Sequence, residues 1–201
     1  DYMTPVEEVM RAFDDLVRSG KVLYAGISDA PAWIIARANT MAELRGWTPF
    51  VGLQIEYSLL ERTVERELLP MAKALGIGVT AWSPLGGGFL TGKYLKDAPK
   101  LAGPEKPRLD VAPGFAARTD RSRLIAETLQ KVAREAGGTA AQAALSWVRR
   151  KGTIPILGNR SLAQLKDNLG CLGLVLEERH LKALDEVSRI DLGFPHEFLE
   201  R

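Results

Sequence analysis

The sequence predicts an α/β protein built from parallel β/α units, and among such folds it favours half of a (β/α)8 barrel. Short, continuous apolar segments of strand length alternate with amphipathic helical segments, which is typical of parallel β/α units. No G-x-G-x-x-G follows the first strand, so the fingerprint of the alternative, an open doubly wound sheet that binds dinucleotides, is absent. Polar residues recur where the strands end, as in a barrel whose functional sites lie on that face.

The first part of the chain holds three helix and three strand predictions in alternation. Helices are predicted over residues 4–18, 31–44 and 64–75, and strands over residues 22–27, 50–57 and 77–82. Thr4 to Glu7 has the pattern of a capping box, with Pro5 at the first helical position. Apolar residues of the first helix recur at spacings of three and four. Pro70 is expected to kink the third helix or to mark its start.

After Ser83 the pattern gives way to a stretch rich in Gly and Pro, about residues 84–121. Its length predicts either a functional excursion or a flexible region. Helices are then predicted over residues 122–136, 139–150, 161–169 and 177–188, with a fourth strand over residues 153–157. Thr139 and Gln142 form a capping box at the start of one of these helices. Four strands are half of the eight that close a barrel.

Composition limits the classes of function. The chain has 201 residues, 46% of them hydrophobic, and a net charge of +2, which suits a globular protein with a sizeable core. The single cysteine, Cys171, cannot form an intrachain disulfide and makes a Cys-based zinc site unexpected. No apolar run approaches the roughly 18 residues that span a membrane, and basic residues are interleaved with acidic ones. We expect a cytoplasmic protein without a membrane or nucleic-acid partner.

Two segments suggest ligand binding on local grounds. Gly158 permits close backbone approach, Arg160 adds a positive charge, and Ser161 begins a helix whose free N–H groups favour an anion. The alternative is a simple helix cap beside a solvated arginine. Trp82 and the three glycines that follow could hold a flat ring, or they could be a core residue and a turn.

The remaining polar residues are assigned more ordinary roles. Gln54 stands in an apolar strand and, if buried, needs hydrogen bonds from a ligand or from backbone groups. Tyr57 is predicted to be a packing residue, and His180 and His196 are predicted to lie at the surface. Adjacent carboxylates such as Asp14 and Asp15 are typical of a solvated helix face. No spacing predicts a metal site.

Four stretches, taken together, resemble the aldo/keto reductase family. They are residues 16–22 (LVRSGKV) with 26–28 (GIS), 54–60 (QIEYSLL), 81–88 (AWSPLGGG) with 90–94 (LTGKY), and 154–160 (IPILGNR) with Leu165, Asp167 and Asn168. In this order and spacing they resemble the family from the end of its fourth strand onward. The resemblance implies that residues 1–201 supply the C-terminal half of a single (β/α)8 TIM barrel, strands five to eight and their helices.

The resemblance further implies a barrel that binds NADP(H) in an extended pose. Ser28 and Gln54 would hydrogen-bond the nicotinamide carboxamide, and Trp82 would stack on the nicotinamide ring. Many members have Asn at the position of Asp29, and an ionised carboxylate there cannot donate a hydrogen bond to the carboxamide oxygen.

The same resemblance assigns residues to the rest of the cofactor. The pyrophosphate would be lined by backbone groups of Ser83, Pro84, Leu85 and Gly86, and Lys93 would neutralise its charge. The 2′-phosphate would be approached by Gly158 and Arg160. The adenine and ribose would be bracketed by Gln164, Asp167 and Asn168. Arg108 is a further candidate for a phosphate contact.

The family's catalytic Tyr, Lys, Asp and His precede the part of the barrel that this chain resembles, and Asp1 would follow shortly after that His. No tyrosine here stands in the catalytic context, so no catalytic residue is assigned. The expected function is NADP(H)-dependent reduction of an aldehyde or ketone to an alcohol, with the chain as its cofactor-binding half. The missing N-terminal half, or a second copy, would cover the open barrel.

There are two alternatives to this function. One is a non-catalytic nucleotide-binding half-barrel that acts as an oligomeric or regulatory subunit. The other, a phosphate-binding barrel enzyme such as an aldolase, requires a Schiff-base lysine inside a strand, and none of the four strands contains one.

Overall fold

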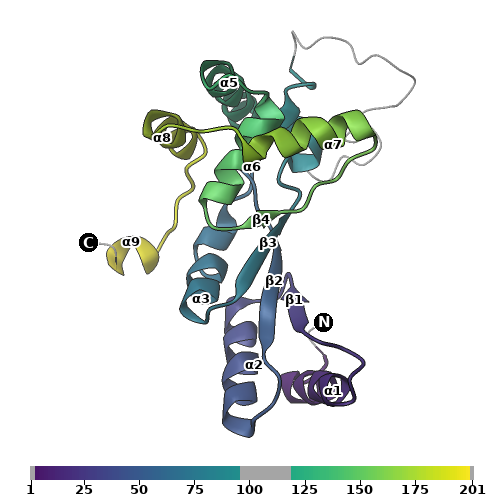
Figure 1. Cartoon of the computed structure of the whole chain (residues 1–201). Coiled ribbons are helices and arrows are strands. Elements are labelled where there is room, and N and C mark those ends of the chain that lie inside the picture. Colours follow the sequence, from purple (N-terminus) through teal and green to yellow (C-terminus); the bar gives the residue numbers. More distant parts are fainter. Residues whose placement is uncertain (1–2, 96–118, 200–201) are drawn as a thin grey trace. The chain divides into compact units, whose positions relative to one another are not determined.

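The computed structural model describes residues 3–95 and 119–199, which fall into two compact units (Figure 1). The first unit takes in the chain up to Ile55 and Val64–Thr80, and the second takes in Glu56–Thr63 and the chain from Ala81 onward. In chain order the first unit contains α1 (Val6–Arg18), β1 (Ala25–Ser28), α2 (Ala32–Arg45), β2 (Phe50–Glu56), α3 (Leu68–Ala74) and β3 (Gly78–Trp82), the last residues of β2 and β3 belonging to the second unit. The second unit contains the 3₁₀ helix η2 (Gly86–Thr91), α5 (Asp120–Glu135), α6 (Ala140–Arg150), β4 (Ile154–Pro155), α7 (Leu162–Leu169), the 3₁₀ helix η4 (Gly170–Leu172), α8 (Glu178–Val187) and α9 (His196–Leu199).

The strands follow the chain order β1-β2-β3-β4 in a four-stranded sheet, and β1 pairs with β2 in parallel. Each of the four lies within one of the predicted segments or one residue beyond its end, so the prediction of an α/β protein with parallel strands is confirmed. β4 is much shorter than the predicted five residues, because Pro155 has no N–H for the strand ladder. The backbone N–H of Ile156 still donates to the Ala81 carbonyl at 2.8 Å.

One face of the sheet in the first unit is covered by helices. Leu53 and Ile55 of β2 and Val79 of β3 are buried together with Ile35 of α2 and Ala72 of α3. Alternate residues of a strand point to opposite faces, so Gly52, Gln54 and Thr80 lie on the other face, where side chains are small or polar. Helices on one face and polar groups on the other place candidate ligand-binding residues away from the core.

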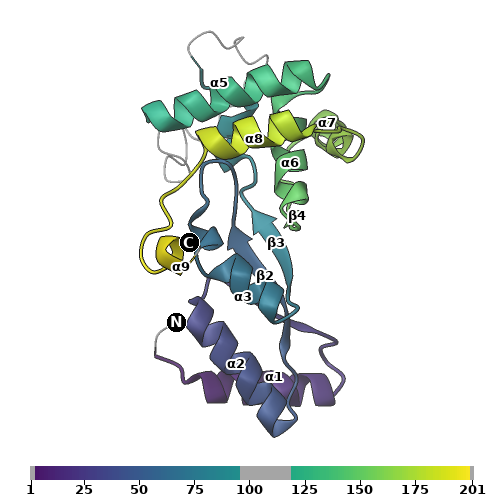
Figure 2. The ribbon, with the colours of Figure 1, turned by 90° about the vertical axis from the view of Figure 1, so that its left-hand side faces the viewer.

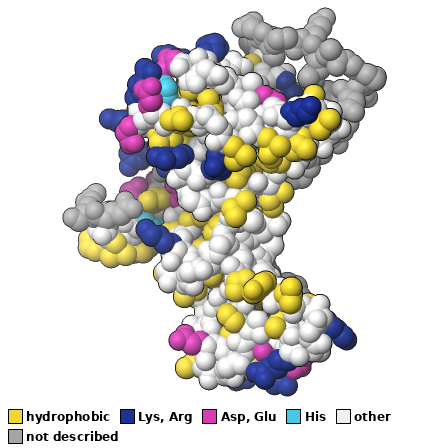
Figure 3. Space-filling model, viewed as in Figure 1, with side chains coloured by type: hydrophobic (Ala, Val, Ile, Leu, Met, Phe, Trp, Pro, Cys, Tyr) yellow, Lys and Arg dark blue, Asp and Glu magenta, His cyan; other side chains and the backbone are white. Residues whose placement is uncertain are grey.

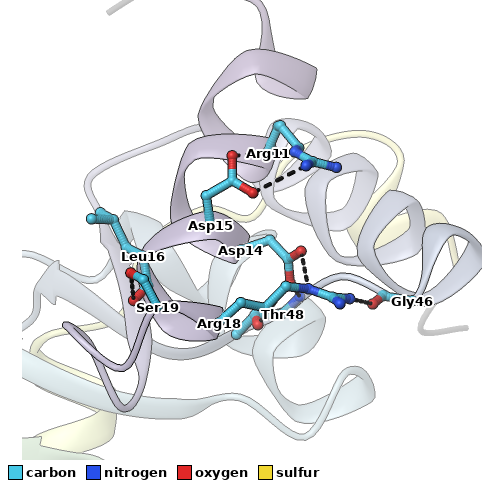
Figure 4. Close-up of polar contacts among 8 residues, drawn as sticks. All are labelled: Arg11, Asp14, Asp15, Leu16, Arg18, Ser19, Gly46 and Thr48. Carbon is cyan, nitrogen blue, oxygen red and sulfur yellow. Dashed lines mark hydrogen bonds and ion pairs between the residues drawn. The ribbon is translucent and has the colours of Figure 1, made fainter.

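α1 is fixed to the loop after α2 by a buried carboxylate (Figure 4). Asp14 is only 2% exposed and accepts hydrogen bonds from the Thr48 backbone N–H at 2.9 Å and from Arg18 Nε at 2.6 Å. Arg18 also donates to the Gly46 carbonyl at 2.9 Å. The prediction that Asp14 belongs to a solvated face is therefore wrong, since tertiary partners satisfy its charge. Asp15, which pairs with Arg11, is exposed as predicted.

The start of α1 also differs from prediction. Pro5, and not Thr4, is the N-cap of α1, and no side chain caps this helix. Trp33 of α2 is 62% exposed, while Ile35, Ala38 and Ala42 form the buried stripe. In α3, Pro70 lies in the first turn, where its missing N–H costs no intrahelical bond, so it marks the start of the helix as predicted.

The helices of the second unit pack around Trp147 of α6, which is fully buried. α5 packs against both α6 and α8, and Figure 2 shows α5 and α8 side by side. The predicted capping box of α6 is confirmed, because Thr139 N–H donates to Gln142 Oε1 at 3.1 Å and Gln142 N–H donates to Thr139 Oγ1 at 3.2 Å.

His180 is 3% exposed, so the prediction that it lies at the surface is wrong. Its Nδ1 accepts the Glu177 backbone N–H at 3.2 Å, which closes a capping box at the start of α8. The imidazole is buried where it caps α8, and its Nε2 lies 3.6 Å from a carboxylate oxygen of Glu135. His196 is half-buried in α9.

The described surface mixes charges of both signs. Figure 3 shows Lys and Arg side chains beside Asp and Glu on the face drawn, and i,i+4 ion pairs such as Arg11–Asp15 and Lys182–Glu186 contribute to this mixing. Among the helices of residues 3–95 and 119–199, none is long and apolar enough to cross a bilayer.

Candidate functional site

The first predicted cluster lies at the carboxyl ends of β1 and β2. Ser28 and Gln54 are register partners across the parallel pair, so the structure brings these two predicted residues together. The chain leaves β1 through Asp29, whose backbone N–H donates to the Gln54 carbonyl at 3.1 Å. Ser28 Oγ donates to Asp29 Oδ2 at 3.0 Å. The two strand ends are therefore joined by backbone and side-chain contacts.

A pocket of about 270 Å³ lies on the uncovered face of the sheet in the first unit. It is lined by Gly26, Ile27, Ser28, Gly52, Leu53, Gln54 and Thr80. A Cβ on Gly52 would meet nothing within 4 Å, so the space above this strand is open. Gln54 is exposed, because the strand buries only its Leu53 and Ile55 side. Its amide can therefore face a ligand.

Asp29 and Ser83 are the non-glycine residues with positive φ among those described, at +49° and +52°. Each directly follows a strand: Asp29 follows β1 and Ser83 follows β3. Left-handed backbone costs a non-glycine residue roughly 1–2 kcal/mol, and such strain clusters at functional sites. Both residues adjoin positions that the resemblance assigns to the cofactor.

The second predicted cluster is the turn after β3 in the second unit. Gly86, Gly87 and Gly88 all have positive φ, at +54°, +62° and +90°, a backbone conformation that favours glycine. Ser83 holds the turn, since its carbonyl accepts the Gly86 N–H at 2.8 Å and its Oγ accepts the Gly87 N–H at 3.3 Å. Trp82, Ser83 and Leu85 are half-buried, and Pro84 and Gly86 are buried.

Lys93 lies directly at this turn. A Cβ built on Gly88 would fall 2.8 Å from Lys93 Nζ, so a side chain at this position would require the ammonium group to shift. The turn thus combines a backbone that a ligand can approach closely with the positive charge of Lys93. This donor set fits an anion such as a pyrophosphate.

The third predicted cluster surrounds the start of α7. Ser161 is the N-cap and its Oγ accepts the Gln164 N–H at 3.2 Å, while Gln164 Oε1 accepts the Arg160 N–H at 2.8 Å. Gly158 and Arg160 are exposed. Asn168, 6% exposed, donates to Asn159 Oδ1 at 2.6 Å. The cap predicted as an alternative is present, and the exposed Arg160 lies beside it.

Asp167 is held by residues that the sequence did not assign to the site. Its carboxylate accepts from Thr139 Oγ1 at 3.3 Å and from Gln142 Nε2 at 3.0 Å. The same Gln142 nitrogen also donates to the Asp167 carbonyl at 2.9 Å. The capping box of Thr139 and Gln142 was visible in the sequence, but its contact with a residue 25 positions away was not.

Candidates for nucleophilic or acid–base chemistry are located elsewhere. Burial raises the pKa of the Cys171 thiol, an effect that Arg149 partly offsets, so the thiol stays protonated. Tyr57 is fully buried and its ring centroid lies 5.4 Å from that of Trp147, which confirms the packing role. Tyr24 is exposed.

Asp1, Tyr2 and Arg108 lie outside the described residues. Within the described ranges, no group of three or more His, Cys, Asp or Glu residues is placed to hold a metal ion.

Comparison with known proteins identifies the family. A model of the aldo/keto reductase family matches residues 1–189. The chain is 37% identical to the probable aryl-alcohol dehydrogenase AAD4 of Saccharomyces cerevisiae over 99% of this chain and 60% of that protein. It is 35% identical to the norsolorinic acid reductase of Aspergillus flavus over 99% of this chain and 49% of that protein. It is 38% identical to the uncharacterized oxidoreductase YrpG of Bacillus subtilis over 93% of this chain and 55% of that protein.

The chain therefore spans roughly half of the length of these curated relatives, from 49% to 60%. The family match covers nearly all of the chain, including the three predicted clusters. This protein belongs to the aldo/keto reductase family.

Proposed function

We propose that this chain is the cofactor-binding part of an NADP(H)-dependent oxidoreductase that reduces an aldehyde or ketone to an alcohol. Family membership supports an oxidoreductase, and relatives named as aryl-alcohol dehydrogenase and norsolorinic acid reductase support carbonyl reduction. The name aryl-alcohol dehydrogenase makes an aromatic aldehyde the first substrate to test.

The observation that supports the cofactor assignment is that Lys93 Nζ lies 2.8 Å from the position that a Cβ of Gly88 would take. Lys93 would neutralise the pyrophosphate while the backbone of Ser83, Pro84, Leu85 and Gly86 lines it. Three successive glycines with positive φ leave no side chain on this stretch of the turn, so a ligand could approach its backbone closely. No side chain at Gly88 intervenes between the turn and the charge.

The other clusters would hold the two ends of the cofactor. Ser28 and Gln54, register partners beside the pocket, would bind the nicotinamide carboxamide. Trp82, half-buried at the end of β3, would stack on the nicotinamide ring. When bound, the cofactor supplies a hydride from its nicotinamide C4 to the carbonyl carbon of the substrate.

The adenosine end would be bound around α7. Gly158 and the exposed Arg160 would approach the 2′-phosphate, because a guanidinium group matches the geometry of a phosphate. Gln164, Asp167 and Asn168 would bracket the adenine and ribose. Asp167 and Asn168 are already fixed by hydrogen bonds from Gln142 and to Asn159, so they require little ordering on binding.

We assign no catalytic residue to this chain. As the family resemblance implies, the general acid that protonates the substrate oxygen would come from outside it. Tyr57 is buried against Trp147 and is not available to a substrate. The four-stranded sheet would be part of a single (β/α)8 barrel, whose remaining strands, or a second copy of the chain, would cover the polar face of β1 and β2. The exposure of Ser28 and Gln54 on that face supports this proposal.

A cofactor titration tests the assignment. NADPH added to the full chain should quench tryptophan fluorescence, and NADH should bind at least about tenfold more weakly because it lacks the charged 2′-phosphate contact. The chain has four tryptophans, so Trp82→Phe must abolish most of the change. Arg160→Ala should reduce the preference for NADPH, whereas Arg150→Ala, at another exposed arginine, should not. Absence of NADPH binding at millimolar concentration would refute the proposal.

A further inference from the structure

We propose that Asp29 is a positioning residue that fixes the Ser28 hydroxyl as a hydrogen-bond acceptor, so that the pocket selects a ligand amide by its NH₂ group. The inference rests on the proposed function, because it concerns how the carboxamide of the cofactor is recognised. It extends that function by naming a residue that acts through Ser28 and by stating which atoms of the carboxamide Ser28 can bind.

The Ser28 hydroxyl has one proton and two lone pairs. Ser28 Oγ lies 3.0 Å from Asp29 Oδ2, and an ionised carboxylate can only accept. The hydroxyl proton is therefore directed to Asp29. Only the lone pairs of Ser28 Oγ remain for a ligand, and these require a donor.

The backbone holds Asp29 in place for this role. Its φ of +49° turns the chain sharply after β1, and its N–H donates to the Gln54 carbonyl at 3.1 Å. Aspartate and asparagine tolerate this conformation better than most residues. The geometry that directs the Asp29 carboxylate to Ser28 is thus set by the pairing of β1 with β2.

The other polar groups of the pocket are not restricted in this way. The Gln54 amide is exposed and carries both donors and an acceptor, and the Thr80 hydroxyl can rotate. Either can therefore donate to a ligand carbonyl oxygen. Ser28 then accepts from the amide NH₂, and a ligand with a methyl group in place of NH₂ leaves the serine lone pairs without a partner.

The test compares NADP⁺ with its 3-acetylpyridine analogue, in which a methyl ketone replaces the amide. Both ligands carry the same charge, so attraction to the Asp29 carboxylate cancels in the ratio of their dissociation constants. Calorimetric titration of the full chain should show the analogue binding about tenfold or more weakly, because an acceptor held by a charged group loses its donor.

In Asp29→Asn the side chain can either donate to or accept from Ser28, so the hydroxyl proton is released and the ratio should fall to within about threefold of unity. Ser28→Ala should lower the ratio in the same way while weakening NADP⁺ binding. Asp15→Asn, which changes an exposed carboxylate of α1, should leave the ratio of the wild-type chain unchanged.

The outcomes separate this inference from the proposed function. If NADP⁺ binds and the ratio in Asp29→Asn equals that of the wild-type chain, the positioning role of Asp29 is overturned and the cofactor assignment stands. If Asp29→Asn weakens both ligands equally, Asp29 has only a structural role and the inference is again overturned. If the wild-type chain binds neither ligand, the proposed function fails and the inference fails with it.

Discussion

Arg62 Nη1 donates a hydrogen bond to Ser188 Oγ at 2.7 Å, and both side chains are buried in the second unit. The contact joins the loop after β2 to the end of α8. Arg62 also donates to the Asp185 carbonyl at 3.0 Å and lies 5.2 Å from the ring centroid of Trp147. Arg121 reinforces the joint by donating to the Ser188 carbonyl at 2.8 Å. The guanidinium group of Arg62 thereby fixes the loop after β2 to α8 and to α6.

Arg62→Ala should lower the free energy of unfolding by about 2–3 kcal/mol, because it removes charge-assisted hydrogen bonds and leaves the buried Ser188 hydroxyl without its donor. Arg62→Lys should recover only part of this loss, since a lysine cannot reproduce the planar fork over the indole. Urea unfolding of the full chain measures both changes. Arg134→Ala, at an exposed arginine of α5, is the control, and an equal effect of Arg62→Ala and Arg134→Ala would contradict the prediction.

Asp14 should make the free energy of unfolding depend on pH in the acidic range. Burial alone would raise the pKa of its carboxyl, but hydrogen bonds from Arg18 and Thr48 outweigh this and hold the pKa below the ordinary value of 3.8. A depressed pKa in the folded state means that the charged form stabilises the fold at neutral pH, and that this stabilisation is lost as the pH falls below 3.8 through the folded pKa.

The measurement is the free energy of unfolding against pH for the wild-type chain and Asp14→Asn. The variant should be less stable at pH 7, and the difference should shrink as the pH falls below the ordinary value of 3.8. Asp15→Asn, four residues from its partner Arg11 on the exposed face, should differ little from the wild-type chain at any pH. A difference between wild type and Asp14→Asn that is constant with pH would exclude the carboxylate as its source.

The sequence predicted the strands and helices well because their patterns are local. The family resemblance also implied that Ser28 and Gln54 bind one ligand group, and the two residues are register partners at the carboxyl ends of adjacent parallel strands. The sequence left open whether Gln54 is buried, because an apolar strand suggests burial on both faces, whereas helices cover only the Leu53 and Ile55 face among the described residues.

The buried polar residues show which contacts a local pattern cannot reveal. The Thr48 backbone N–H that donates to the Asp14 carboxylate is 34 positions away in the sequence, so the residues near Asp14 do not indicate that it is buried. His180 is different, because its partner Glu177 is three positions away and the helix start was visible in the sequence. Histidine is an uncommon member of a capping box, and this explains why the pattern was not recognised there.

Gly88→Ala should weaken cofactor binding through Lys93. An added Cβ would lie 2.8 Å from Lys93 Nζ and force the ammonium group away from the glycine turn. We expect the dissociation constant for NADPH to rise about tenfold, the scale of one charge-assisted contact. Lys93→Ala should produce a similar rise, and the two changes combined should not add, because both remove the same contact.

Gly137→Ala is the matched control for this substitution. Gly137 has φ +75°, close to the +90° of Gly88, but a Cβ there would meet nothing within 4 Å. Both variants should lose about 1–2 kcal/mol of stability from left-handed backbone, while only Gly88→Ala should affect NADPH binding. Equal NADPH affinities in the two variants would show that Lys93 does not contribute from its present position.

Gln142 should affect both the stability of α6 and the binding of the adenosine end. Gln142→Ala removes the capping box with Thr139 and the hydrogen bonds to Asp167, so unfolding should become easier by about 1–2 kcal/mol. Release of Asp167 should also weaken NADPH binding by about threefold, because the carboxylate must then be ordered by the ligand.

Gln142→Glu separates these two roles. A glutamate can still accept the Thr139 backbone N–H and keep the cap, but it cannot donate to Asp167 and places a second negative charge 3.0 Å from the carboxylate. At low pH the repulsion between the two carboxyl groups is removed. The thermal unfolding temperature of Gln142→Glu, which keeps the α6 cap, should therefore be higher there than that of Gln142→Ala. At pH 7, NADPH should bind Gln142→Glu at least as weakly as Gln142→Ala. If Gln142→Glu instead binds NADPH like the wild-type chain, Asp167 has no part in holding the adenosine.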